Sequence, residues 1–146
     1  MQASPTRSEL LELLPYLTGP ERAELDRLLA KEATPPPLEA FTRATFQTYQ
    51  VNWHHRVLCE YLDRFVSGDI KRLMVFMPPR HGKSELVSRR LPAYLLGRDP
   101  DAAIIACSYG SDLASRMNRD VQRIMDSPEY ATVFPGTRLF GANVRT

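Results

Sequence analysis

The chain has 146 residues and a formal net charge of +2, with 43% hydrophobic and 25% charged residues. This length suits one domain with its own core and is too short for two full-sized domains. No apolar stretch approaches the length of a membrane span, and the start lacks the basic and apolar regions of a secretory signal, so we expect neither. Only two cysteines are present, without a partner at metal-ligand spacing, which favours reduced thiols in a cytoplasmic protein.

The N-terminal segment predicts short helices followed by a linker. Two Thr-x-x-Glu pairs, at 6–9 and 18–21, have the spacing of a capping box, and leucines recur at helical spacing after each pair. The run Thr-Pro-Pro-Pro at 34–37 cannot continue a helix and indicates a stiff connection. We therefore expect residues 1–37 to form a helical appendage with a proline linker, packed on the main domain or acting as a partner-binding arm, and residues 38–146 to form the main domain.

The main domain begins with helical patterns. A short helix is expected around 38–46. A longer helix is predicted for 54–66, where Val57, Leu58, Tyr61, Leu62 and Phe65 lie on one face, and Gly68 is placed to end it.

The pattern then changes to alternating strands and helices. Compact apolar runs at 72–77 and 102–107 suit strands buried on both faces of a parallel sheet. A helix is expected from about Ser84, which Pro92 should kink or end early, and an amphipathic helix is expected over 111–125. This order predicts an α/β fold, namely an incomplete P-loop NTPase-type parallel sheet flanked by helices, with the N-terminal appendage attached.

The tripeptide Gly82-Lys83-Ser84 stands between the first predicted strand and the next helix, which is the context of a phosphate-binding loop. Gly82 lets the backbone approach phosphate oxygens, and amides at the helix start point toward the anion. Lys83 supplies positive charge for the terminal phosphates, and Ser84 offers its hydroxyl to a magnesium ion. The motif therefore predicts ATP and Mg²⁺ as ligands.

One position departs from the general pattern G-x-x-x-x-G-K-[ST], because Met77 stands in place of the first glycine. Taken alone, Gly-Lys-Ser is also compatible with a surface turn that opens a helix. The apolar run before the loop and the second predicted strand after it favour the nucleotide site.

The block Met-Pro-Pro-Arg-His-Gly-Lys-Ser-Glu at 77–85 resembles the variant phosphate loop of bacteriophage terminase large subunits. In that family the first glycine is often missing and an arginine sits inside the loop. Upstream, Tyr-Gln at 49–50 and Trp-His-His at 53–55 resemble the adenine-side motif and the helix that follows it. Downstream, residues 108–135 are similar to the next strand–helix unit, so the resemblance covers about 38–140.

The resemblance implies a nucleotide site built from the loop and one earlier residue: Gln50, Pro79, Arg80, His81, Gly82, Lys83, Ser84 and Glu85. It implies that Lys83 and Ser84 bind phosphate and magnesium. It also implies that Arg80 reaches the terminal phosphate from the same subunit and stabilises the charge that builds during transfer. Judged without the family, Arg80 is a base near an anion, and Gln50 is a cap or a solvated residue.

The function that the resemblance implies is DNA packaging, in which an ATPase couples hydrolysis to translocation of double-stranded DNA into a procapsid. The implied partners are DNA, the small terminase subunit, the portal and further copies in a homo-oligomeric ring, in the cytoplasm of the infected bacterial host. In the family, the Walker B acid, the arginine donated to a neighbouring subunit and the nuclease domain come later in the chain. We therefore expect a partial motor that binds ATP weakly and scarcely hydrolyses it.

Two alternatives stay open at this point. The first is a non-catalytic nucleotide-binding or interaction module from a truncated prophage gene, acting through its N-terminal helices. The second is another P-loop enzyme, such as an ATPase of helicase type. A small-molecule kinase would need an acceptor-binding lid, and no segment of this sequence suggests one.

The predicted helix over 111–125 carries an arginine stripe. Arg116, Arg119 and Arg123 fall on one face and would suit a DNA backbone. Aspartates of the same helix sit at pairing distance, Asp112 from Arg116 and Asp120 from Arg123. A solvated, salt-bridged face is therefore the favoured interpretation.

Overall fold

The computed structural model describes residues 14–22, 25 and 35–139. The chain divides into two compact units, Met1–Thr34 and Pro35–Thr146. Within the described residues, no helix combines the length and the apolar character that crossing a membrane requires.

The first unit contains a 3₁₀ turn, η1, over Leu14–Tyr16, and a helical stretch at 19–22. The Glu21 carboxylate accepts hydrogen bonds from the Thr18 backbone N–H at 2.9 Å and from the Thr18 hydroxyl at 2.6 Å. These bonds lower the pKa of Glu21. The bond to the backbone N–H confirms the carboxylate half of the capping box predicted at 18–21. The pair predicted at 6–9 lies outside the described residues.

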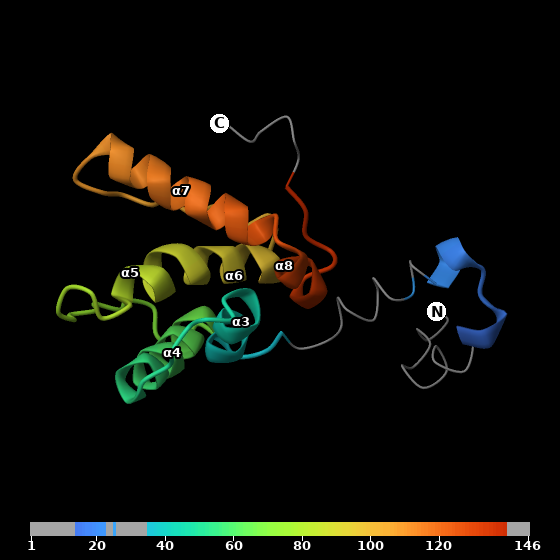
Figure 1. Cartoon of the computed structure of the whole chain (residues 1–146), viewed down its shortest axis with the longest axis horizontal. Coiled ribbons are helices and arrows are strands. Elements are labelled where there is room, and N and C mark those ends of the chain that lie inside the picture. Colours follow the sequence, from blue (N-terminus) through green and yellow to red (C-terminus); the bar gives the residue numbers. More distant parts are fainter. Residues whose placement is uncertain (1–13, 23–24, 26–34, 140–146) are drawn as a thin grey trace. The chain divides into compact units, whose positions relative to one another are not determined.

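The second unit is built from helices joined by irregular segments (Figure 1). In chain order they are α3 Leu38–Thr45, α4 Trp53–Val66, α5 Lys83–Glu85, the π-helical turn η2 Leu86–Arg90, α6 Leu91–Arg98, α7 Ser111–Met125 and α8 Pro128–Val133. The elements α5, η2 and α6 follow one another directly, so residues 83–98 form one helical run. This run contacts α7 on one side and α3 on the other, while α4 packs on α3.

Three of the predicted helices are confirmed. They are α3, α4 and α7, whose bounds agree with the predictions to within a residue. At the start of α4, the Asn52 side chain accepts from the Trp53 N–H at 2.7 Å. Gly68 lies just past the end of α4 with φ 87°, a left-handed conformation that glycine adopts without strain.

The predicted P-loop NTPase-type parallel sheet is wrong for the part of the chain that the structure describes. The apolar runs 72–77 and 102–107 are neither helical nor paired as strands. A strand obtains its backbone hydrogen bonds from a neighbouring strand, and these two runs do not supply one another with such bonds. Part of their apolar surface is left uncovered, since Met74 is 79% exposed, Phe76 83% and Ile105 89%. In the first run, Leu73, Val75 and Met77 are partly buried and pack against the core.

Pro92 was predicted to kink its helix or to end it early, and the early end is wrong, because the helical run continues to Arg98. The local disturbance lies earlier, in η2, where the Leu91 N–H bonds the Leu86 carbonyl five residues back. Pro92 then occupies the first turn of α6. Its missing N–H is tolerated because the π-helical turn has already shifted the hydrogen-bond pattern.

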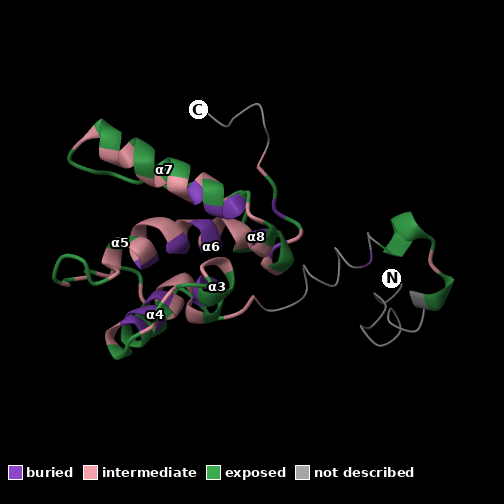
Figure 2. Ribbon diagram, in the orientation of Figure 1, coloured by how far each residue is buried: buried purple, intermediate pink, exposed green. Residues whose placement is uncertain are grey.

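The core of the second unit centres on four aromatic rings, those of Phe41, Tyr94, Tyr130 and Phe134. Five pairs among them have ring centroids 5.3 to 6.0 Å apart, in tilted or edge-to-face geometry. Both tyrosine hydroxyls donate to backbone carbonyls, at 2.8 and 3.0 Å, so neither is left unpaired by burial. Figure 2 shows buried residues on the sides where the helices face one another.

The two cysteines differ in accessibility: Cys59 on α4 is buried, and Cys107 is exposed. Burial, with added repulsion from Asp63 and Glu39, raises the pKa of Cys59 to about 12. Because the thiolate is the reactive form, we expect a maleimide to label Cys107 near neutral pH and to label Cys59 only after unfolding. Mass spectrometry of the labelled protein measures this, with Cys107→Ser as the control. Rapid labelling of the folded Cys107→Ser protein would contradict the burial of Cys59.

Candidate functional site

The loop before the helical run 83–98 carries most of the predicted site residues. Its backbone has φ 64° at Arg80 and φ 77° at Gly82. The His81 Nδ1–H donates to the Pro79 carbonyl at 2.8 Å and closes the turn between them. A non-glycine residue at positive φ is strained by about 1–3 kcal/mol, so surrounding contacts must hold Arg80 in this conformation.

Gly82 is required by its neighbours as well as by its backbone angle. A Cβ atom at this position would lie 2.7 Å from His55 Nε2 and 3.1 Å from the Tyr49 hydroxyl. The loop therefore passes directly against the segment that leads into α4. Burial of Tyr49 in this contact raises the pKa of its hydroxyl to about 12.

The start of α5 has the properties of an anion site. Gly82 is its N-cap residue, and no side chain caps the helix. The first N–H groups of a helix have no acceptor within the helix, so those after Gly82 remain for a ligand. Lys83 forms no ion pair with any described residue, and Ser84 is exposed. An ammonium, free N–H groups and a hydroxyl fit a phosphate group and its magnesium ion.

A polar hollow of about 300 Å³ lies beside the loop. Its lining comes from the segment before α4, the first turn of α4 and the loop: Gln50, Val51, Asn52, His54, His55, Arg80, His81 and Gly82. The structure thus brings Gln50 to the same hollow as Arg80 and Gly82, although these residues are far apart in sequence. Lys83 and Ser84 follow directly along the chain.

Glu85, predicted to contact the nucleotide, is held by two arginines. One carboxylate oxygen accepts from Arg90 at 2.7 Å and the other from Arg89 at 3.0 Å. Arg90 also donates to the Thr45 carbonyl at the end of α3, at 2.9 Å. The Glu85 side chain therefore helps to tie the helical run to α3.

Asp120 of α7 joins the same network. It accepts from Arg89 at 2.8 Å and from Arg123 at 3.2 Å. The second contact confirms the ion pair predicted between Asp120 and Arg123. For the other predicted pair, Asp112 with Arg116, the described residues show no contact within ion-pair distance.

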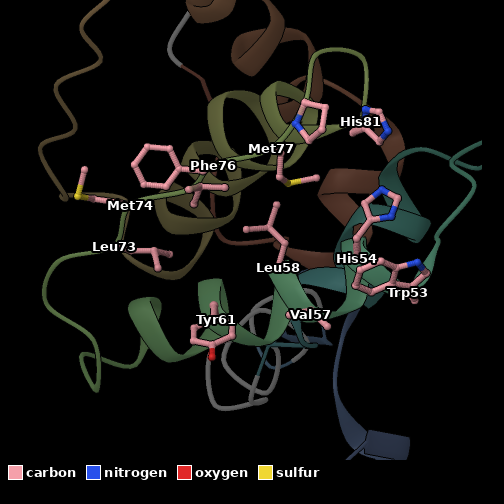
Figure 3. Close-up of a pocket in the computed structure, with 12 residues that line it drawn as sticks. Trp53, His54, Val57, Leu58, Tyr61, Leu73, Met74, Phe76, Met77 and His81 are labelled. Atoms are coloured by element: carbon pink, nitrogen blue, oxygen red, sulfur yellow. The ribbon is translucent and has the colours of Figure 1, made fainter.

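A larger groove, of about 580 Å³, shares His54 and His81 with the polar hollow and runs between α4 and the segment 73–78 (Figure 3). Its remaining walls are mainly apolar: Trp53, Val57, Leu58, Tyr61, Leu73, Met74, Val75, Phe76, Met77 and Pro78. It contains no lysine or arginine and none of the free N–H groups of α5, which a phosphate requires. We therefore place the candidate site at the polar hollow and the loop.

Two residues of this site were not assigned to it by sequence reasoning. His55 is 9% exposed and contacts the loop directly, and the Tyr49 hydroxyl lies against Gly82. A local signal existed for His55, since it stands three residues after Asn52 in capping-box spacing. That pattern usually has Glu or Gln at the later position, and in α4 the His55 ring takes that place.

Comparison with known families adds one match. Residues 74–139 match the family model described as "Terminase large subunit, T4likevirus-type, N-terminal". The matched region contains the loop, the helical run, α7 and α8, but not Gln50 or α4. The comparison with curated proteins and the comparison with solved structures each found no match.

Proposed function

Residues 74–139 match the N-terminal part of the bacteriophage terminase large subunit family, and from this match we propose that the loop binds the phosphates of ATP. The match supports a role in phage DNA packaging. The observation that carries the proposal is the turn at Arg80 and Gly82, which leads into a helix start that no side chain caps.

Each loop residue has a part in this proposal. Gly82 allows the backbone to approach phosphate oxygens, and Lys83 pairs with the terminal phosphates. Ser84 would hold Mg²⁺, which supplies charge neutralisation on the phosphate oxygens. Pro79 and His81 hold the shape of the turn through their hydrogen bond.

Three further residues act around the loop. Arg80 is exposed, and its guanidinium acts with Lys83 to stabilise negative charge that develops on the transferred phosphate. Gln50 lines the polar hollow together with the loop, where it would contact the adenine base. Glu85 acts through its arginine pairs, which hold the helical run in place.

The family match also supports the wider activity that we propose. This is coupling of ATP hydrolysis to translocation of double-stranded DNA into a procapsid, by a homo-oligomeric ring with the small terminase subunit and the portal, in the cytoplasm of the infected host. No apolar run of residues 1–146 ends in the acid that positions magnesium and the acid that activates water. We therefore expect this chain to bind ATP with little turnover.

Calorimetric titration with magnesium-ATP tests the proposal. We expect Lys83→Ala to weaken binding by about tenfold or more, because a charge-assisted bond contributes about 1.5–3 kcal/mol and 1.4 kcal/mol is a factor of ten. Lys71→Ala, which removes an exposed lysine outside the loop, is the matched control and should bind like the wild type. Equal affinities for the two variants would disprove the site. A steady-state ATPase assay checks turnover, and rapid hydrolysis would show that a water-activating acid has been overlooked.

A further inference from the structure

One imidazole ring joins the two sides of the polar hollow. The Nδ1 atom of His55 accepts a hydrogen bond from the Asn52 backbone N–H at 3.0 Å. Its Nε2 atom lies 3.1 Å from the carbonyl oxygen of His81. The ring therefore connects the cap of α4 with the residue that precedes Gly82.

These two contacts define the protonation state of the ring. A backbone N–H can only donate and a carbonyl can only accept, so Nδ1 of His55 carries no proton and Nε2 carries one. The ring is then neutral and has both nitrogens in use. A side chain that replaces it must offer an acceptor toward Asn52 and a donor toward His81.

The contact with His81 bears on the strained part of the loop. Arg80 has positive φ, and the bond between His81 and Pro79 is internal to the loop. Among the described residues, His55 provides the side-chain hydrogen bond that reaches the loop from another element. Its Nε2 also occupies the space beside Gly82, 2.7 Å from where a Cβ atom would stand.

We propose that His55 is a positioning residue, which holds the phosphate loop in its ligand-receiving shape by binding the His81 carbonyl. This rests on the proposed function of the loop. His55 acts through the loop backbone. The same ring fixes the position of the segment that carries Gln50 relative to the loop that would bind phosphate. The cap of α4 and the shape of the loop are thus linked by one side chain.

Two variants separate the loop contact from the cap. His55→Asn keeps an oxygen near the place of Nδ1, which can accept from Asn52, but its side chain is too short to reach His81. His55→Gln carries an acceptor and a donor at the greater reach and can make both contacts. We expect His55→Asn to weaken magnesium-ATP binding by about tenfold and His55→Gln to stay within about threefold of the wild type. A role in the cap alone predicts equal affinities for the two variants, and that result would overturn the proposal.

Limited trypsin digestion of the ligand-free protein tests whether His55 holds the shape of the loop when no nucleotide is bound. Cleavage after Arg80, measured by mass spectrometry, should be about fivefold faster in His55→Asn than in the wild type, and restored by His55→Gln. Arg72 is exposed and lies outside the loop, so cleavage there is the internal control. An unchanged rate at Arg80, or an equal increase at Arg72, would overturn the proposal. Faster cleavage at Arg80 in a protein whose wild type binds no ATP would support loop holding by His55 and reject the nucleotide function.

Discussion

Replacing Phe41 by alanine is expected to lower the free energy of unfolding of the second unit by about 3–5 kcal/mol. Phe41 is 0% exposed, and its ring centroid lies 5.3 Å from Tyr94, 6.0 Å from Tyr130 and 5.7 Å from Phe134. Removing the ring leaves a cavity that these three neighbours share and cannot fill without leaving their own contacts. Since domains are stable by only about 5–15 kcal/mol, the loss is a large part of the total.

Urea unfolding followed by circular dichroism measures this loss, and Phe76→Ala is the matched control. It makes the same change of side chain at a position that is 83% exposed, so we expect a change within about 0.5 kcal/mol. A similar loss in both variants would mean that Phe76 is covered in solution and that the aromatic cluster is not the centre of the core.

Replacing Gly82 by alanine is expected to abolish detectable binding of magnesium-ATP and to destabilise the second unit by about 1–3 kcal/mol. Alanine is strained at φ 77°, and its Cβ would stand 2.7 Å from His55 Nε2. Either the loop or the start of α4 must then move. The loop and the α4 side of the hollow together form the proposed site, and this movement separates them.

Gly136→Ala is the control for this change, because no atom lies within 4 Å of the added Cβ and the backbone angle is not in the left-handed region. It should leave binding unchanged and shift the free energy of unfolding by at most about 1 kcal/mol. Calorimetry and urea unfolding of both variants give the comparison. Wild-type affinity in Gly82→Ala would be incompatible with a phosphate site at this loop.

The helices α3, α4 and α7 were predictable because their signals are local. Each has apolar residues at helical spacing, and α4 also has Asn52 before it and Gly68 after it. Which side of α4 is buried was less predictable. Leu58 and Leu62 are buried as expected, whereas Val57 and Tyr61 are 43% and 45% exposed and line the apolar groove. A broad apolar stripe does not show which of its edges meets a neighbour.

The predicted sheet failed for a related reason. Apolar composition at 72–77 and 102–107 indicates that these segments prefer burial, and their short length suits a strand. Pairing, however, needs backbone groups of another segment at hydrogen-bond distance, and no local pattern supplies that information. The polar hollow could not be predicted for the same reason, since whether Gln50 and Arg80 line one hollow depends on how α4 packs.

The order of residues along the chain was enough to locate the helices, the Gly82-Lys83-Ser84 loop and the resemblance to the terminase family that residues 74–139 match, because these depend on neighbours within a few positions. Folding in three dimensions was needed to pair Glu85 with its arginines, to leave the apolar runs unpaired and to bring His55 against the loop. Those contacts join distant segments through packing and hydrogen bonds, and their geometry exists only once the helices are assembled.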